Sequence, residues 1–102
     1  MSRIIDFKEF LLDRGISIRE YSDISLYYKI LTSHSLKISL SLMLKFSSII
    51  LIHNTKKGKI TIFFDATSQK YVAKIKNNND ETCIEGKLEY VISNIIKYLR
   101  DN

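Results

Sequence analysis

The most regular pattern in the chain is an alternation of apolar and polar residues between Leu36 and Phe46. Every even-numbered position in this segment is Leu, Ile or Phe, and the odd-numbered positions are Lys or Ser except for Met43. Residues two apart share one face of a strand, whereas a helix would scatter these leucines around its surface. The pattern therefore predicts a half-buried β-strand over residues 36–46.

The alternation ends at Ser47-Ser48, where a continuous apolar run begins at Ile49. At about 3.3 Å per residue, a strand continuing to His53 would be about 60 Å long. A domain of this size has a radius of gyration of only about 13 Å. We therefore predict a bend, bulge or turn at Ser47-Ser48.

The second half of the chain reads as a series of short strands separated by turns. Segments rich in residues that tolerate turn backbone geometry occur at residues 54–58, 66–69 and 77–80. The runs between them predict strands near 49–53, 59–65, 70–76 and 81–85. Because the connections are short, neighbouring strands should be antiparallel and form a meander.

Helix signals occur near both ends of the chain. Asp6 and Glu9 have capping-box spacing and Gly15 suits a helix end, which predicts a helix over residues 7–14 that buries Phe7, Phe10 and Leu11. A longer amphipathic helix is predicted from Lys87 to Arg100. Its apolar residues recur at helical spacing: Leu88, Val91, Ile92, Ile95, Ile96 and Leu99.

Two further segments are less distinctive. The alternation over residues 16–21 suggests a short edge strand after Gly15. Residues 23–32 fit both periods, since their apolar positions satisfy strand alternation and helical spacing alike. We favour a strand there by a narrow margin.

These elements predict an α+β fold. It consists of an antiparallel β-meander sheet, with a short N-terminal helix and a longer C-terminal amphipathic helix packed on it. The 102 residues are 45% hydrophobic and 26% charged, a composition typical of globular domains. We therefore expect a single domain over residues 1–102.

The sequence also bears on membrane insertion and on the cellular compartment. The most apolar stretch, residues 36–52, contains Lys37, Lys45 and several serines, so no membrane span is predicted. A lone cysteine, Cys83, excludes an internal disulfide and suits a reducing compartment. The first residues carry no secretory signal pattern. We expect an intracellular, cytoplasmic protein.

No motif for catalysis, metal binding or cofactor binding is found in the sequence. His34, His53 and Cys83 lack the paired spacing of a metal site, so we predict neither a metal nor a cofactor. Cys83 alternates with its neighbours inside a predicted strand, which favours a packing role over nucleophilic catalysis. The chain has only 3 glycines, too few for a phosphate-binding loop. We expect a protein that is not an enzyme.

The predicted meander allows its two faces to be written down. With simple registers, Ile49, Leu51, Phe63 and Val72 form an apolar strip on one face, and lysines flank it. The other face is the better core, with Ile50, Ile52, Ile60, Ile62, Phe64, Tyr71, Ala73 and Ile75. Either another part of the chain covers the strip as a second small core, or a partner does.

The leading hypothesis is a non-catalytic protein-protein interaction module. The strip of Ile49, Leu51, Phe63 and Val72, or a neighbouring strand edge, would bind a second copy of the chain or a partner peptide. The alternative is a nucleic-acid-binding protein, motivated by the net charge of +5. In that case Phe63 would stack on a base, and phosphates would contact Lys56, Lys57, Lys59, Lys74 and Lys76.

The composition suggests a type of source. It is rich in Ile, Lys, Ser, Asn and Tyr and contains neither Pro nor Trp. In this it resembles small proteins of AT-rich genomes, including those of archaeal viruses. The resemblance implies a location in the host cytoplasm if the protein is viral, and it transfers no site residues.

Overall fold

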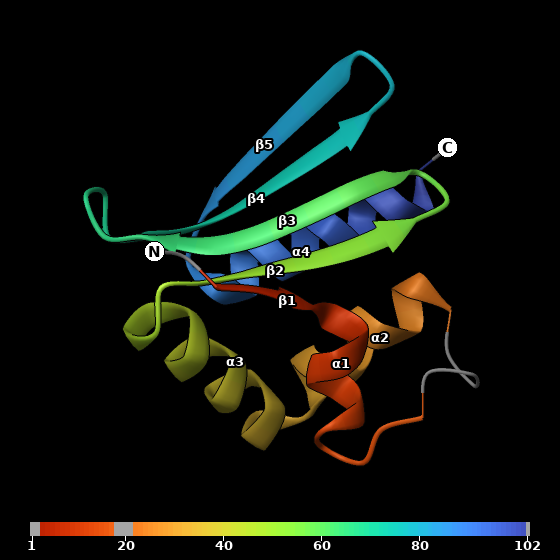
Figure 1. Ribbon diagram of the computed structural model, residues 1–102. Coiled ribbons are helices and arrows are strands. Elements are labelled where there is room, and N and C mark those ends of the chain that lie inside the picture. The colour runs from red at the N-terminus through yellow and green to blue at the C-terminus, as the bar shows by residue number, and fades with distance from the viewer. Residues whose placement is uncertain (1–2, 18–21, 102) are drawn as a thin grey trace.

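The computed structural model describes residues 3–17 and 22–101. Within these residues the chain forms five strands and four helices (Figure 1). In chain order they are β1 (Arg3–Asp6), α1 (Phe7–Leu12), α2 (Asp23–Thr32), α3 (His34–Phe46), β2 (Ile49–Thr55), β3 (Gly58–Asp65), β4 (Lys70–Asn77), β5 (Asp80–Gly86) and α4 (Leu88–Arg100). The strand expected at residues 16–21 falls mostly outside the described residues, and Ile16 and Ser17 are not in a strand.

The strands form one sheet in the order β1-β2-β3-β4-β5. The antiparallel meander predicted for the second half of the chain is confirmed as β2 to β5. β1 was not predicted, and it pairs with β2 in parallel, with Arg3 opposite Ile49. Four residues are too few to show a periodic pattern, so only the neighbouring edge of β2 makes this segment a strand.

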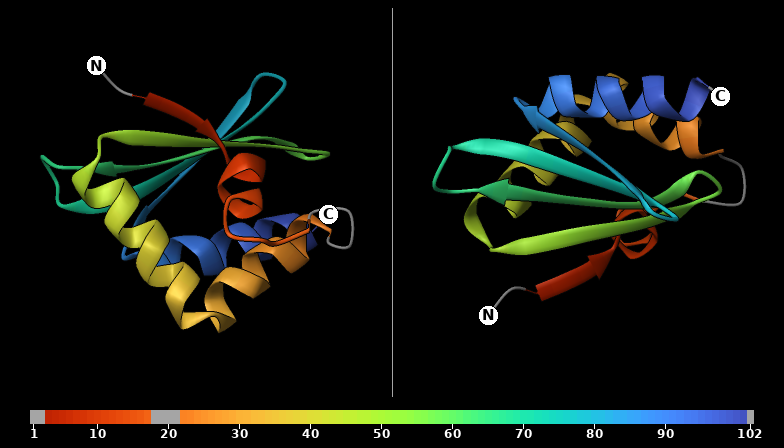
Figure 2. Two further views of the ribbon diagram at one scale, coloured as in Figure 1. Left: turned by 60° about the horizontal axis from the view of Figure 1, so that its bottom comes forward. Right: turned by 90° about the horizontal axis from the view of Figure 1, so that it is seen from above.

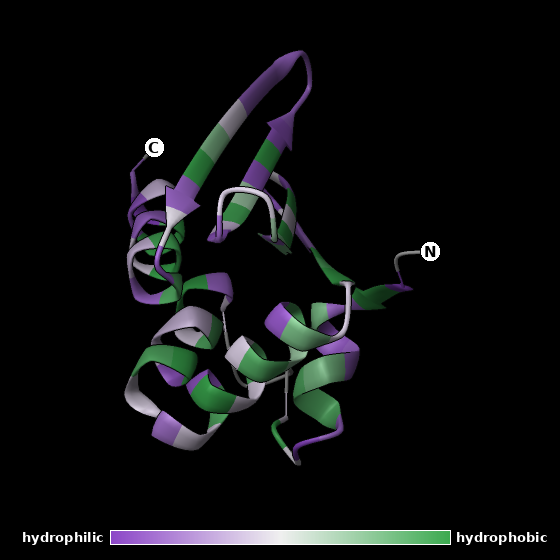
Figure 3. Cartoon of the chain, turned by 90° about the vertical axis from the view of Figure 1, so that its left-hand side faces the viewer, coloured by the Kyte–Doolittle hydropathy of each residue, from purple (hydrophilic) through white to green (hydrophobic). Residues whose placement is uncertain are grey.

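The helices of the described chain lie together on one face of the sheet (Figure 2). α1 packs against β1 and β2, α3 against β2 and β3, and α4 against β4 and β5, while α2 contacts both α3 and α4. No described helix covers the opposite face, which we call the open face. The far end of the β4–β5 hairpin projects beyond the helices and is hydrophilic (Figure 3).

The segment predicted as a strand over residues 36–46 is a helix, α3, and that prediction was wrong. In a helix, apolar residues at every second position form two stripes on opposite faces. Positions i, i+4 and i+8 align along one face, and positions i+2, i+6 and i+10 align along the other. Leu36, Leu40 and Leu44 form the buried stripe. The second stripe is exposed, with Ile38 at 43%, Leu42 at 52% and Phe46 at 71%.

Residues 23–32 are also helical, so the helical reading was the correct one of the two. Ser22 caps α2 by accepting a hydrogen bond from the backbone N–H of Ser25. Leu26, Tyr27 and Ile30 point into the core, as helical spacing requires. The strand preference failed because Tyr27 and Leu31 fall on the polar side of the alternation, and because the Ser22 cap is a signal for a helix start.

The predictions for α1, for α4 and for the break before β2 are confirmed. The Asp6 carboxylate accepts a hydrogen bond from the Lys8 N–H, and Gly15 has a positive φ of 75° after the helix. Each apolar residue predicted for the stripe of α4 is buried. The break falls at Ser48, whose φ is 48°.

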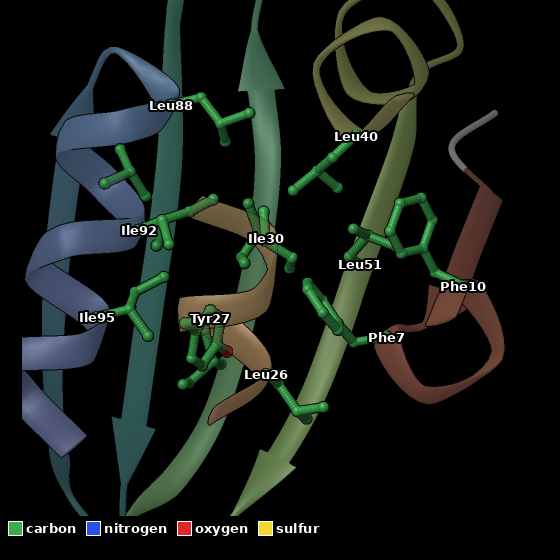
Figure 4. Packing of buried hydrophobic residues seen from close by; sticks show 14 of the residues in the cluster. Phe7, Phe10, Leu26, Tyr27, Ile30, Leu40, Leu51, Leu88, Ile92 and Ile95 are labelled. Carbon is green, nitrogen blue, oxygen red and sulfur yellow. The ribbon is translucent and has the colours of Figure 1, made fainter. Parts of the chain in front are cut away.

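One hydrophobic core joins the helices to the sheet (Figure 4). Leu40 of α3, Leu51 of β2, Ile30 of α2 and Ile92 of α4 all point into it. Facing residues of β3 and β4 complete the core: Ile60, Ile62, Ala73 and Ile75. The sheet is thus apolar and covered on one side, while the open face on the other side carries no described helix.

The register of β2 differs by one residue from the prediction. Phe63 lies opposite Val72 as predicted, but Leu51 lies opposite Ile62 rather than Thr61. The hairpin closes tightly with Thr55 opposite Gly58, so the connection is shorter than expected. Because a slip of one residue exchanges the faces of a strand, Ile49 and Leu51 belong to the core, and placing them on one face with Phe63 was wrong.

Candidate binding surfaces

A buried polar cluster links α2 to β2. His53 is 8% exposed, and a hydrogen bond of 2.8 Å joins its Nδ1 to the Tyr27 hydroxyl, which donates when the ring proton is on Nε2. Its Nε2 lies 3.4 Å from a carboxylate oxygen of Asp23, and the Phe7 ring stacks on it at 5.5 Å between centroids. Both ring nitrogens of a neutral His53 therefore have partners inside the fold.

The electrostatics of this cluster favour a structural role. Burial lowers the pKa of His53, although the carboxylates of Asp23 and Asp6 act in the opposite direction. Burial also raises the pKa of the Tyr27 hydroxyl, so that it stays protonated as a donor. Since both nitrogens of His53 are engaged, the ring has no free position for proton transfer to a substrate.

Within residues 3–17 and 22–101, no three His, Cys, Asp or Glu side chains gather in a group that could hold a metal ion. In the same residues, none of the helices has the length and the apolar run that a bilayer span requires. Cys83 is exposed on β5, opposite Lys74, rather than packed inside the fold. The packing role expected for this cysteine was therefore wrong, because β5 is an edge strand and no described helix covers its outward face.

A groove of about 610 Å³ lies between α3 and the start of α4, with Tyr71 of β4 in its lining. We call it the α3–α4 groove. Its apolar lining includes Ile38 and Leu42 from the exposed stripe of α3, together with Tyr90 of α4. These three are among the most exposed large hydrophobic side chains of the described chain. An apolar hollow with exposed walls is typical of a partner-binding site.

Polar contacts hold the walls of the α3–α4 groove in place. Lys37 of α3 forms a salt bridge of 2.6 Å with Glu89 of α4, and this contact lowers the pKa of the Glu89 carboxyl. The hydroxyls of Ser41 and Tyr71 lie 2.7 Å apart, which joins α3 to β4. The two helices and the strand thus form a defined groove rather than a gap between loose elements.

A smaller hollow of about 410 Å³ lies on the open face of the sheet. Its lining consists of Ile50, Lys59, Thr61, Phe63, Lys74, Lys76 and Glu81. The Lys74 amino group lies 5.7 Å from the centre of the half-buried Phe63 ring. Lys59 and Lys76 are directly opposite each other on β3 and β4. We call this surface the lysine hollow.

The structure separates the residues predicted for partner binding. Phe63 and Val72 are neighbours on the open face, while Ile49 and Leu51 are buried under the helices. The apolar residues that β2 contributes to the open face are instead Ile50 and Ile52, as a consequence of the one-residue register shift.

The lysines predicted for nucleic-acid binding divide into two groups. Lys59, Lys74 and Lys76 come together in the lysine hollow. Lys56 is exposed at the tip of the β2–β3 hairpin, away from that hollow. The Lys57 amino group donates hydrogen bonds to the carbonyls of Leu99 (2.6 Å) and Asp101, so it caps the end of α4.

The residues of the α3–α4 groove were missed by sequence reasoning. Ile38 and Leu42 were assigned to the buried face of a strand, together with Leu36 and Leu40. A helical reading of residues 36–46 would have shown two apolar stripes, of which a helix on a sheet can bury only one. That surplus stripe is the sequence signal for the groove.

Comparison with known proteins gives no significant match to this chain, whether with protein-family models, with curated proteins or with solved structures.

Proposed function

We propose that this protein is a non-catalytic protein-interaction module whose α3–α4 groove binds an amphipathic helix carrying acidic residues. The observation that carries the proposal is the second apolar stripe of α3, which no described element covers. Exposed apolar side chains in a row cost solubility, and they persist where a partner buries them. The full engagement of His53 supports a binding role over a catalytic one.

The geometry of the stripe suits a helical partner. Ile38 and Phe46 are eight positions apart, which corresponds to about 12 Å along the helix axis, or slightly more than two turns. A helix docked beside α3 at about 8–10 Å between axes would place its own apolar residues at i, i+4 and i+7 against this row. Leu42 stands in the middle of the stripe, where a central anchor contributes most to binding.

The charges around the groove favour an acidic partner. Lys37 and Glu89 in the lining pair with each other, so their charges balance. Lys87 in the lining and Lys45 in the last turn of α3 leave the surroundings of the groove positive. The chain as a whole carries +5. A second copy of the chain would bring like charges together, so carboxylates beside the apolar anchors of another protein are the better complement.

A pair of designed peptides tests this proposal. The first is a helical peptide with leucine at every third or fourth position and glutamate on either side, and the second carries lysine in place of each glutamate. Fluorescence anisotropy with the full chain should show binding of the acidic peptide and at least tenfold weaker binding of the basic one, because tenfold corresponds to about 1.4 kcal/mol. Leu42→Asp should abolish binding of the acidic peptide.

Leu12→Asp is the matched control, since Leu12 of α1 is 57% exposed and Leu42 is 52% exposed, but only Leu42 lines the groove. This variant should bind the acidic peptide like the wild type. Equal affinity for both peptides, unchanged binding by Leu42→Asp, or no binding of the acidic peptide would overturn the proposal. Sedimentation showing a wild-type dimer that Leu42→Asp dissociates would also overturn it, in favour of a second copy as the occupant.

A further inference from the structure

We infer that the lysine hollow on the open face binds single-stranded nucleic acid, with Phe63 as a stacking platform for a base and Lys59, Lys74 and Lys76 as phosphate contacts. This inference goes beyond the proposed function and does not depend on it. The helices that form the α3–α4 groove cover one face of the sheet (Figure 2). The residues that line the hollow lie on the other face. Two ligands could therefore occupy the molecule together.

The first argument is the unbalanced charge of the hollow. Lys59 faces Lys76 directly across the β3–β4 pair, and Lys74 is two residues away on the same side of β4. Like charges in directly opposite positions destabilise a sheet. In the described part of the chain, none of these three lysines forms a salt bridge. A bound anion would relieve this repulsion.

The carboxylates of the neighbouring strand reduce this charge without cancelling it. Glu81 of β5 pairs with Lys76 in the sheet register and lines the hollow. Glu85 lies opposite Val72, which separates it from Phe63. Glu81 can offset one of the three lysines, so the hollow keeps a positive balance. The hollow is therefore suited to phosphate groups rather than to a neutral peptide.

The second argument is the position of the aromatic ring. Phe63 is half-buried, and it lies beside Val72, which is almost fully buried although it faces away from the helices. The ring is thus supported from the sheet and accessible from the hollow. An aromatic side chain on an open sheet face, with cations around it, is the usual platform on which an unpaired base stacks.

The shape of the surface favours a single strand over a duplex. A sheet face is too broad to enter the major groove, which admits a helix or a two-stranded ribbon. A base can reach the Phe63 ring only when it is unstacked from its neighbours, as in single strands. Lys74 and Lys76, two residues apart on β4, are separated by about 7 Å along the strand and can contact different phosphates.

Binding of fluorescein-labelled oligo(dT) and oligo(U) to the full chain, measured at several salt concentrations, tests the inference. Lys59→Gln, Lys74→Gln and Lys76→Gln should each weaken binding and reduce the slope of log affinity against log salt by about 0.7. Phe63→Leu keeps an apolar side chain but removes the stacking surface. It should weaken binding about fivefold or more, corresponding to about 1 kcal/mol of stacking, without changing the salt slope.

Lys97→Gln is the matched control, because it removes the same charge from an exposed position on α4, on the side of the sheet away from the hollow. This variant should bind the oligonucleotides like the wild type. Thermal unfolding followed by circular dichroism checks that every variant is folded.

Three results would overturn the inference. One is no binding of either oligonucleotide at low salt, and another is a loss for Lys97→Gln as large as that for Lys74→Gln, which would indicate non-specific attraction. The third is equal affinity for poly-glutamate, which would assign the hollow to an acidic protein segment. Failure of the peptide experiment on the α3–α4 groove leaves this test unaffected, since the two surfaces use different residues and probes.

Discussion

At the scale of single residues, His53 shows how a polar side chain is accommodated in the core. Tyr27 and Asp23, both from α2, engage its two ring nitrogens, and Phe7 packs on its ring. A buried polar group without partners would lower the stability of the fold by about 1–3 kcal/mol. The cluster therefore favours the observed packing of α2 against β2 over arrangements that leave His53 without these partners. Sequence reasoning could identify His53 as a titratable group but could not identify its partners.

His53 predicts a dependence of stability on pH. Burial lowers its pKa in the folded state below the value of 6.5 that it has when exposed. The unfolded chain therefore binds the proton more readily. The stabilisation is complete above pH 6.5 and is lost progressively as the pH falls from 6.5 toward the lower folded pKa. Urea midpoints should accordingly decrease between about pH 7.5 and pH 5.5.

The variant His53→Phe separates this residue from other titrating groups. It removes the titration and should flatten the pH dependence in that window, whereas His34→Phe, at an exposed position, should leave it unchanged. A dependence that persists in His53→Phe would assign the effect to another group.

At the scale of elements, α3 shows why periodicity alone can mislead. A period of two over residues 36–46 is compatible with a strand that has one apolar face and with a helix that has two apolar stripes. The preceding Ser33, which caps α3 by accepting a hydrogen bond from the Leu36 N–H, favours the helix. The helix buries Leu40 and exposes Leu42, although the two residues are equivalent in the alternation.

This difference predicts unequal effects of the same substitution. Leu40→Ala should lower the free energy of unfolding by about 2–5 kcal/mol, because it leaves a cavity in the core. Leu42→Ala should change it by no more than about 0.5 kcal/mol. Chemical denaturation of both variants measures the contrast. Equal losses would mean that both residues lie on one buried face, as in the strand that the alternation suggested.

At the scale of the whole molecule, one core holds the described helices to one side of the sheet and leaves the other side open. α4 lies against β4 and β5 and also contacts α2, so it connects the sheet to the rest of the helical layer. Because the elements share this core, we expect them to unfold together in a single transition.

Substitution in α4 tests this cooperativity. Ile92→Ala should cost about 2–5 kcal/mol, since Ile92 is fully buried where α4 meets the core. Ser93→Ala, at an exposed position next to it, should change stability by less than about 0.5 kcal/mol. Far-ultraviolet circular dichroism and tyrosine fluorescence should give coincident curves for both variants. Transitions that separate would show that α4 and the sheet unfold independently.

The features that the sequence alone determined are those with local causes. The cap at Asp6, the order of strands and turns in the meander, and the single apolar stripe of α4 each depend on residues close together in the chain, and each was correctly predicted, although the β2–β3 turn is shorter than expected. Hydrogen bonds within a turn or a cap and the burial of one helical face need no knowledge of distant partners.

The tertiary structure alone decided the features that depend on distant neighbours. β1 is a strand because it pairs with the edge of β2. α3 turns one of its two equivalent apolar stripes inward because the sheet can cover only one. The tight turn that ends at Gly58 determines which face of β2 is buried. Both candidate surfaces follow from these choices. The exposed stripe of α3 lines the α3–α4 groove. The register of β3 and β4 brings the lysines of the lysine hollow together on the uncovered face. Both surfaces depend on how elements pack against one another, which no single element determines.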